Sequence, residues 1–218
     1  MTVIKICGIT RADDALFAAQ FGVDMLGFNF FKRSPRYIAP AEARRICKSL
    51  REQLDDACPL LVGLFVNATD SDITGTMQQV GLNVAQLSGD ESDEMIAELR
   101  GAGDKAIRPM NMAMALDDVQ YFSAHMPSNE RLPSLLLDAY HPTLYGGTGE
   151  QASTDVALAV KEKVPRLMLA GGLTPENVTG RIQAIQPWGV DVASGVEDDQ
   201  PGIKNQEKMK AFIEAVGD

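Results

Sequence analysis

Apolar residues along the chain gather in eight short runs, and each run is followed by a stretch with helical spacing. Short apolar runs bounded by turn residues are typical of buried strands, and apolar positions three and four apart are typical of helices. The pattern predicts strands at residues 3–7, 24–30, 60–66, 83–87, 105–109, 134–138, 166–170 and 189–193. It predicts helices at 11–21, 40–54, 70–80, 90–100 or 92–100, 113–125, 155–162, 174–185 and 204–216.

This regular alternation implies a parallel sheet in which the helices are crossover connections. Eight such units favour an α/β fold of the closed (β/α)₈ kind, the TIM barrel, in which residues 1–218 form one compact domain without a linker. An open, doubly wound sheet is the competing architecture. The turn after the first strand lacks the G-x-G-x-x-G pattern that an open sheet would need to hold a dinucleotide.

The opening stretch VIKICGIT carries the first chemical signal. Residues two apart in a strand share a face, so Lys5 and Cys7 would point inward while Ile4 and Ile6 face the helices. Gly8 permits a sharp exit from the strand, and Thr10 is a good helix N-cap. Cys7 therefore ends a strand at the edge of the sheet where parallel α/β folds place their chemistry.

Two more candidates follow later strands. Arg36 comes after Ser34-Pro35, where a stiff loop could present its planar guanidinium to a carboxylate; the alternative is an exposed arginine in a basic loop. Asp138 ends the run SLLLD, where burial would raise its pKa and make it a usable proton donor. The alternative for Asp138 is a simple cap of a loop or helix.

Glycine-bearing turns follow the last three predicted strands. Such turns let backbone N–H groups approach an anion closely, and barrels often bind phosphate in the loops after strands seven and eight. They would allow an acidic chain to hold a phosphate without a basic patch. The turns are Gly146 to Gly149, Gly171 to Leu173, and Ser194 to Val196.

The composition of the chain limits the classes of molecule that it is expected to bind. A formal net charge of −10 argues against a nucleic-acid backbone or an anionic membrane surface. No apolar run is long enough to span a bilayer and no leader pattern opens the chain, so we expect a cytoplasmic protein. Three scattered cysteines and two distant histidines indicate neither disulfides nor a metal centre.

Several motifs in order resemble the phosphoribosylanthranilate isomerase family, from about Lys5 to the last helix. They are VIKICGIT, GFNFFKRSPRYI, VGLFVN, QLSGDE, LLLDA with GGTG, LAGGLTPENV and GVDVASGVE ahead of PGIK. The resemblance implies a (β/α)₈ barrel with no metal or cofactor, and we expect either a monomer or a homodimer. It also implies an Amadori rearrangement in tryptophan biosynthesis, from N-(5-phosphoribosyl)anthranilate to 1-(2-carboxyphenylamino)-1-deoxyribulose 5-phosphate.

Position by position, the resemblance makes Cys7 the general base and Asp138 the general acid. It makes Arg36 the residue that holds the anthranilate carboxylate. The loops that grip the phosphate would contain Gly149, Gly171, Gly172, Ser194 and Gly195. Cys7 would work better with a cation nearby, and Lys5 on the same strand face is the candidate.

The chain departs from the family pattern at some positions. Ser88 stands where the family commonly has a histidine, and EQASTDVA follows GGTG where a Phe-Asp-Trp cluster is usual. Two other functions remain in view. One is a related barrel enzyme such as indole-glycerol-phosphate synthase, which a cysteine in place of an acid–base lysine disfavours. The other is a barrel that binds a phosphorylated metabolite without converting it.

Overall fold

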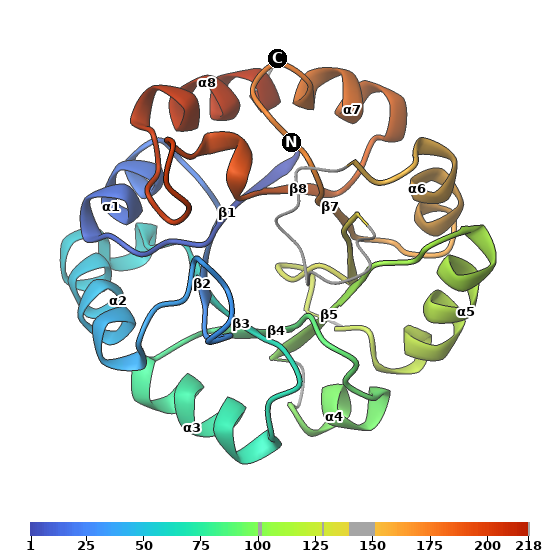
Figure 1. The fold of residues 1–218 in the computed structure, drawn as a ribbon, viewed down its shortest axis with the longest axis horizontal. Coiled ribbons are helices and arrows are strands. Elements are labelled where there is room, and N and C mark those ends of the chain that lie inside the picture. The colour runs from blue at the N-terminus through green and yellow to red at the C-terminus, as the bar shows by residue number, and fades with distance from the viewer. Residues whose placement is uncertain (100–101, 128, 140–150, 218) are drawn as a thin grey trace.

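Eight parallel strands close into a barrel in the order β1 to β8, and the helices form a ring around it (Figure 1). This computed structural model describes residues 1–99, 102–127, 129–139 and 151–217. Neighbouring strands pair in parallel all the way round, and β8 closes the ring on β1 through the register Lys5–Asp191. The predicted (β/α)₈ barrel is confirmed, and the open sheet is excluded.

The strands are β1 (Val3–Cys7), β2 (Met25–Asn29), β3 (Leu60–Phe65), β4 (Val84–Leu87), β5 (Gly103–Ile107), β6 (Leu135–Leu137), β7 (Leu167–Leu169) and β8 (Gly189–Val192). The helices are α1 (Ala12–Gln20), α2 (Pro40–Leu54), α3 (Asp70–Val80), α4 (Asp93–Glu98), α5 (Met112–Phe122), α6 (Thr154–Lys161), α7 (Val178–Ile185) and α8 (Gln206–Gly217). In the described part of the chain, no helix is long and apolar enough to cross a bilayer.

Most predicted boundaries hold within two residues, and those of α2 and α3 are confirmed. The largest difference is in α7, which begins at Val178 rather than at 174. The fifth strand begins at Gly103 rather than at 105, which places Asp104 in the barrel wall. Thr10 is not the N-cap of α1. Arg11 holds that position without a side-chain hydrogen bond, and the Thr10 hydroxyl donates instead to the backbone oxygen of Gly202 at 2.5 Å.

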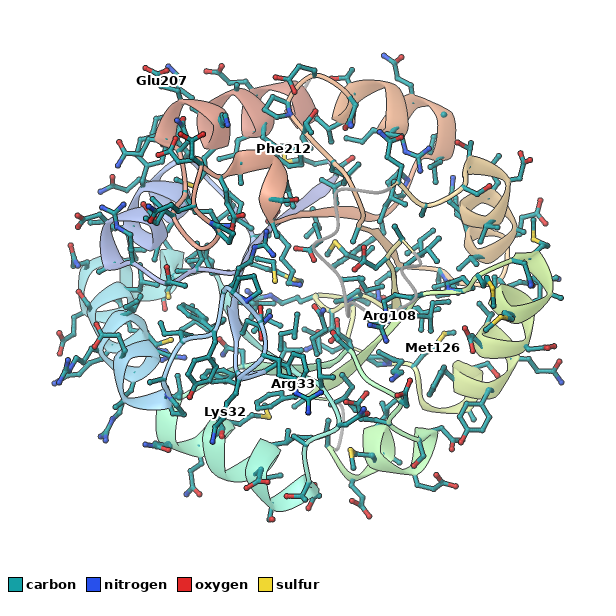
Figure 2. The ribbon with its side chains drawn as sticks, viewed as in Figure 1. Lys32, Arg33, Arg108, Met126, Glu207 and Phe212 are labelled. Carbon is teal, nitrogen blue, oxygen red and sulfur yellow. The ribbon has the colours of Figure 1, made fainter. Side chains whose placement is uncertain are left out.

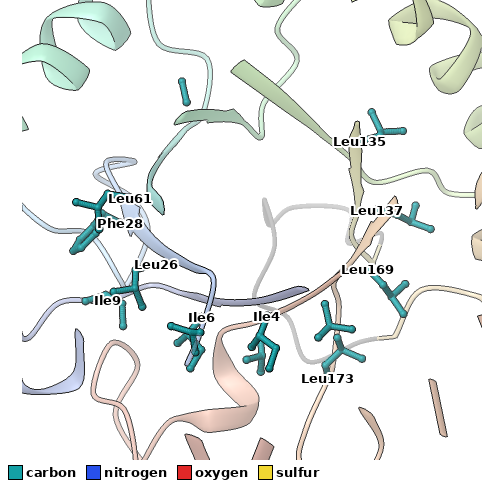
Figure 3. Packing of buried hydrophobic residues seen from close by; sticks show 14 of the residues in the cluster. Ile4, Ile6, Ile9, Leu26, Phe28, Leu61, Leu135, Leu137, Leu169 and Leu173 are labelled. Carbon is teal, nitrogen blue, oxygen red and sulfur yellow. The ribbon is translucent and has the colours of Figure 1, made fainter. Parts of the chain in front are cut away.

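The outward faces of the strands form one apolar layer against the helices (Figure 3). Ile4, Ile6, Leu26, Phe28 and Leu61 are all at most 7% exposed. Helix residues such as Ile46 of α2 and Phe212 of α8 belong to the same cluster. Burying this much apolar surface is the main favourable contribution to folding.

The inward faces differ from one end of the barrel to the other. An apolar plug fills part of the interior, formed by Met25, Val62, Val84, Ala106, Leu132, Leu136, Met168 and Ala170. Buried polar side chains share the interior with this plug, and Gln86 and Asp191 among them lie at the carboxyl ends of the strands. The barrel is therefore a packed interior with a polar mouth, and the mouth is where chemistry can take place.

Candidate active site

The carboxyl ends of the strands surround an open cavity of about 950 Å³, a volume that includes space open to solvent. Arg33 and Arg108 line this cavity, and Figure 2 shows Arg108 inside the ring of helices, away from Glu207 at the rim. Most of the predicted site residues meet here, although their segments are far apart in sequence. The predicted residues that line the cavity are Cys7, Arg36, Asp138, Gly171, Gly172 and Ser194.

Cys7 is the last residue of β1 and is 6% exposed. The neighbouring strand makes room for its sulfur, because a Cβ at Gly27 would lie 2.8 Å from Cys7 Sγ. Burial raises the pKa of the Cys7 thiol, although the cations of Lys5, Lys204 and Arg36 act in the opposite direction. Lys5 thus acts in the predicted direction, but burial outweighs it and favours the neutral thiol of Cys7.

Asp138 follows β6 directly and faces the same cavity. Its Oδ1 accepts a hydrogen bond of 2.8 Å from the backbone N–H of Ala139. Burial raises the pKa of Asp138 to about 6, with the Asp191 carboxylate adding to the rise and Arg108 opposing it. A buried carboxyl group with this pKa can hold a proton and release it close to neutral pH.

Arg36 is held in the wall of the cavity by a rigid loop. Its backbone N–H donates to Ser34 Oγ at 3.1 Å, and Asn29 of β2 donates to the same oxygen at 3.1 Å. Gly8 leaves space for the Arg36 side chain, since a Cβ there would lie 2.5 Å from Arg36 Cδ. Arg36 is therefore a buried, positioned cation, and the alternative of an exposed arginine is wrong.

Glu197 is a partner of Arg36 that the sequence interpretation missed. Arg36 Nε and Nη2 donate to its two carboxylate oxygens at 2.8 and 2.7 Å, in the two-point geometry that fixes a guanidinium most firmly. Lys204 Nζ donates to Glu197 Oε1 at 3.0 Å, and the Gly202 N–H at 2.9 Å. The VASGVE motif contains this glutamate, but only the folded chain brings it across from residue 36.

The turns after β7 and β8 form another part of the wall. Gly171 and Gly172 have φ of 86° and 58°, which side chains rarely tolerate. Asn177 fixes this turn by donating to the Gly172 oxygen at 2.8 Å. Gly195 does not line the cavity; it lets the β8 loop approach the Leu173 oxygen, where a Cβ would collide. Gly149 lies outside the described residues.

A polar cluster lies inside the barrel below Cys7 and Asp138. Lys5 donates to Asp191 Oδ2 at 3.1 Å and to Gln86 Oε1. Burial favours a neutral Lys5, but the negative charges of Asp191, Cys7 and Asp104 together outweigh burial and raise the pKa of the ammonium above its ordinary value. Burial also raises the pKa of Asp104 to about 7. Of this cluster, only Lys5 was predicted to face inward.

The arrangement supplies a proton donor, a thiol that can act as a base, and a positioned cation around one cavity. Over residues 1–99, 102–127, 129–139 and 151–217, no three histidine, cysteine or acidic side chains are placed to hold a metal ion. Acid–base chemistry on a small anionic substrate fits these groups.

Comparison with known proteins gives a consistent result. Residues 4–215 match the family model for N-(5'-phosphoribosyl)anthranilate (PRA) isomerase. The N-(5'-phosphoribosyl)anthranilate isomerase of Geotalea uraniireducens is 41% identical over 213 residues, covering 98% of this chain and 97% of that protein. The crystal structure of phosphoribosyl anthranilate isomerase from Thermotoga maritima matches with a TM-score of 0.85 and 34% identity, covering 100% of this chain and 99% of that one.

A second solved structure shows a bound ligand. It is a phosphoribosyl anthranilate isomerase in complex with reduced 1-(o-carboxyphenylamino)-1-deoxyribulose 5-phosphate. It matches with a TM-score of 0.82 and 33% identity, covering 100% of this chain and 99% of that chain.

Proposed function

The chain belongs to the N-(5'-phosphoribosyl)anthranilate isomerase family, and we propose that it performs the family reaction with Asp138 as general acid and Cys7 as general base. The activity is the isomerisation of N-(5-phosphoribosyl)anthranilate in tryptophan biosynthesis. One observation carries the assignment of roles: Cys7 and Asp138, from strands on different sides of the barrel, line the same cavity. We take residues 1–218 to act as one catalytic unit.

The first step is opening of the ribose ring. Asp138 gives its proton to the ring oxygen, the bond between that oxygen and C1 breaks, and an iminium forms between C1 and the anthranilate nitrogen. A pKa of about 6 suits this role, because the group keeps a proton often enough at neutral pH and is still a usable acid.

The second step is removal of the proton from C2. The neighbouring iminium acidifies this proton, and Cys7 as thiolate takes it, so the electron pair of the C–H bond becomes the C1–C2 double bond of an enolamine. The enolamine becomes the ketone by moving its C2 hydroxyl proton to C1. One proton has left Asp138 and one has reached Cys7, so transfer between them restores the free enzyme.

Cys7 must lose its thiol proton before it can act. Lys5, Lys204 and Arg36 all favour the thiolate, and the iminium would add a positive charge beside it. Cations around a buried sulfur therefore compensate for part of the cost that burial imposes on the charged form.

Binding groups at the two ends of the substrate would hold the reacting carbons between acid and base. Arg36 uses two donor positions on Glu197, and its remaining guanidinium protons are available to the anthranilate carboxylate. We assign the phosphate to the backbone N–H groups of the loops that contain Gly171, Gly172, Ser194 and Gly195, with Gly149 as a further predicted member. A cytoplasmic location and a monomeric or homodimeric assembly stay predictions.

Rescue of a tryptophan auxotroph that lacks only this step tests the function. We expect growth with the wild-type gene and none with Cys7→Ala or Asp138→Asn at matched soluble expression. Failure of the wild-type gene to restore growth, with the protein present and folded, would contradict the activity. Rescue by either variant at the wild-type rate would remove that residue from its catalytic role.

A further inference from the structure

We propose that Ser88 is a substrate-contacting residue that donates its hydroxyl proton to an oxygen of the bound ribose, and that Lys5 and Gln86 set the direction of this donation. This inference rests on the proposed function, because that function places a ribose in the cavity. It adds a contact on the β4 side of the mouth, away from the loops of β7 and β8 and from Arg36.

A directed chain of hydrogen bonds begins at Lys5. Its ammonium group has donors and no acceptor, so the group that Gln86 turns towards Lys5 must be the carbonyl oxygen Oε1. This contact settles the orientation of the Gln86 amide, which is otherwise ambiguous between oxygen and nitrogen. Asp191 fixes Lys5 from the other side at 3.1 Å.

The same chain then determines what Ser88 can do. With Oε1 facing Lys5, the Gln86 Nε2 group faces Ser88 and donates to its Oγ at 2.9 Å. A hydroxyl that accepts this bond still has its own proton to give. Within the described part of the chain, Ser88 Oγ makes no further hydrogen bond.

Ser88 lies where its hydroxyl proton can be donated into the cavity. Ser88 is 4% exposed and follows β4 directly, where its backbone N–H donates to the Phe65 oxygen at 2.8 Å. It lines the same cavity as Cys7 and Asp138. A fixed, neutral donor suits a sugar hydroxyl oxygen, whereas the charged groups of the substrate already have Arg36 and the glycine loops.

Isosteric exchange at Gln86 gives a direct test of the direction. In Gln86→Glu the carboxylate has only acceptors, so one oxygen can keep the bond to Lys5 while the other takes the Ser88 proton. The Ser88 hydroxyl would then point away from the substrate with almost no change in shape. Ser88→Ala removes the same donor, and Ser88→Thr keeps it.

We expect Ser88→Ala to lower kcat by roughly five- to tenfold, the size of one lost neutral hydrogen bond near the reacting carbons. Gln86→Glu should lower kcat at least as much, and Ser88→Thr should recover most of the loss. In a double-mutant cycle, Gln86→Glu should have a much smaller effect in the Ser88→Ala background, because the two changes remove the same bond.

Ser134→Ala is the matched control. Ser134 is a serine 2% exposed that lies just before β6, at the amino end of the barrel, so kcat should stay within about twofold of wild type. Thermal unfolding of every variant reports on folding. If Gln86→Glu does not fold, the kcat values of Ser88→Ala and Ser88→Thr alone test the role of the Ser88 hydroxyl.

Three results would overturn the inference. They are a Ser88→Ala enzyme with wild-type kcat, a loss confined to KM, or an undiminished effect of Gln86→Glu in the Ser88→Ala background. An inactive wild-type enzyme would overturn the proposed function as well. An active wild type with an unaffected Ser88→Ala variant would overturn only the role of Ser88.

Discussion

The inner and outer faces of the same eight strands differ sharply. The outward residues, such as Ile6, Leu26 and Leu61, are uniformly apolar and pack against the helices. The inward residues include Lys5 and Asp104, which are buried and charged. The outer face holds the barrel together, while the inner face accepts costly buried charge in order to place reactive groups. Substitutions on the two faces should therefore separate stability from activity.

Removal of the base should give the largest effect on activity. In Cys7→Ala, no group is left at the end of β1 to take the C2 proton, so kcat should fall by at least ~10², as when a general base is lost. Steady-state turnover of N-(5-phosphoribosyl)anthranilate measures this, and the circular dichroism spectrum should match wild type. A kcat near that of wild type would mean that another group removes the proton.

An outward substitution should have the opposite profile. Leu61 of β3 is fully buried against the helices, so Leu61→Ala should lower the free energy of unfolding by about 2–5 kcal/mol through lost contacts and a cavity. The kcat below the unfolding temperature should stay within about twofold of wild type. Urea unfolding and turnover at 25 °C measure the two quantities. A large loss of kcat with little loss of stability would contradict the assignment of stability to the outward face and activity to the inward face.

Asp104 points into the barrel but has no proposed catalytic role, so it reports the effect of a buried ionisable group on stability alone. Its pKa is about 7 in the folded protein, above the 3.8 of an ordinary aspartate, because burial disfavours the carboxylate. The folded state thus binds more protons between these two values, and stability is lost as pH rises through this window. Asp104→Asn should remove that loss and raise the free energy of unfolding at pH 8 by roughly 2–3 kcal/mol.

Urea unfolding at pH 5 and pH 8 tests this prediction. The difference between Asp104→Asn and wild type should be larger at pH 8 than at pH 5. An equal difference at both values would show that the Asp104 carboxyl does not titrate in this range.

Arg36 should give the smallest of these effects on the reaction, through substrate binding, and loss of its ion pair with the buried Glu197 carboxylate should also lower the free energy of unfolding. Arg36→Ala removes charged hydrogen bonds to the anthranilate carboxylate, so KM should rise by roughly tenfold or more. Arg36→Lys keeps the positive charge but not the planar guanidinium, so its KM should lie between those of wild type and Arg36→Ala. Binding of reduced 1-(o-carboxyphenylamino)-1-deoxyribulose 5-phosphate gives an independent readout, and an unchanged Kd would remove Arg36 from the carboxylate site.

The fold could be predicted from the sequence because the outward strand residues are apolar and recur in eight regularly spaced runs. Cys7 and Asp138 could be placed at strand ends for the same reason. Glu197 could not be assigned, since its contact with Arg36 spans 161 residues and no local pattern reports it. Asp104 was missed because an acidic residue near a strand start resembles loop sequence, so the predicted strand began too late.

The pH dependence of kcat/KM tests the acid–base account most directly. The active form needs Asp138 protonated, with a pKa of about 6, and Cys7 ionised, with a pKa above its ordinary value. The fraction of this form rises up to pH 6, stays constant, and falls only above the pKa of Cys7. Wild type should therefore show a break near pH 6 that is absent from the residual activity of Asp138→Asn. A break near pH 6 that persists in Asp138→Asn would contradict the account.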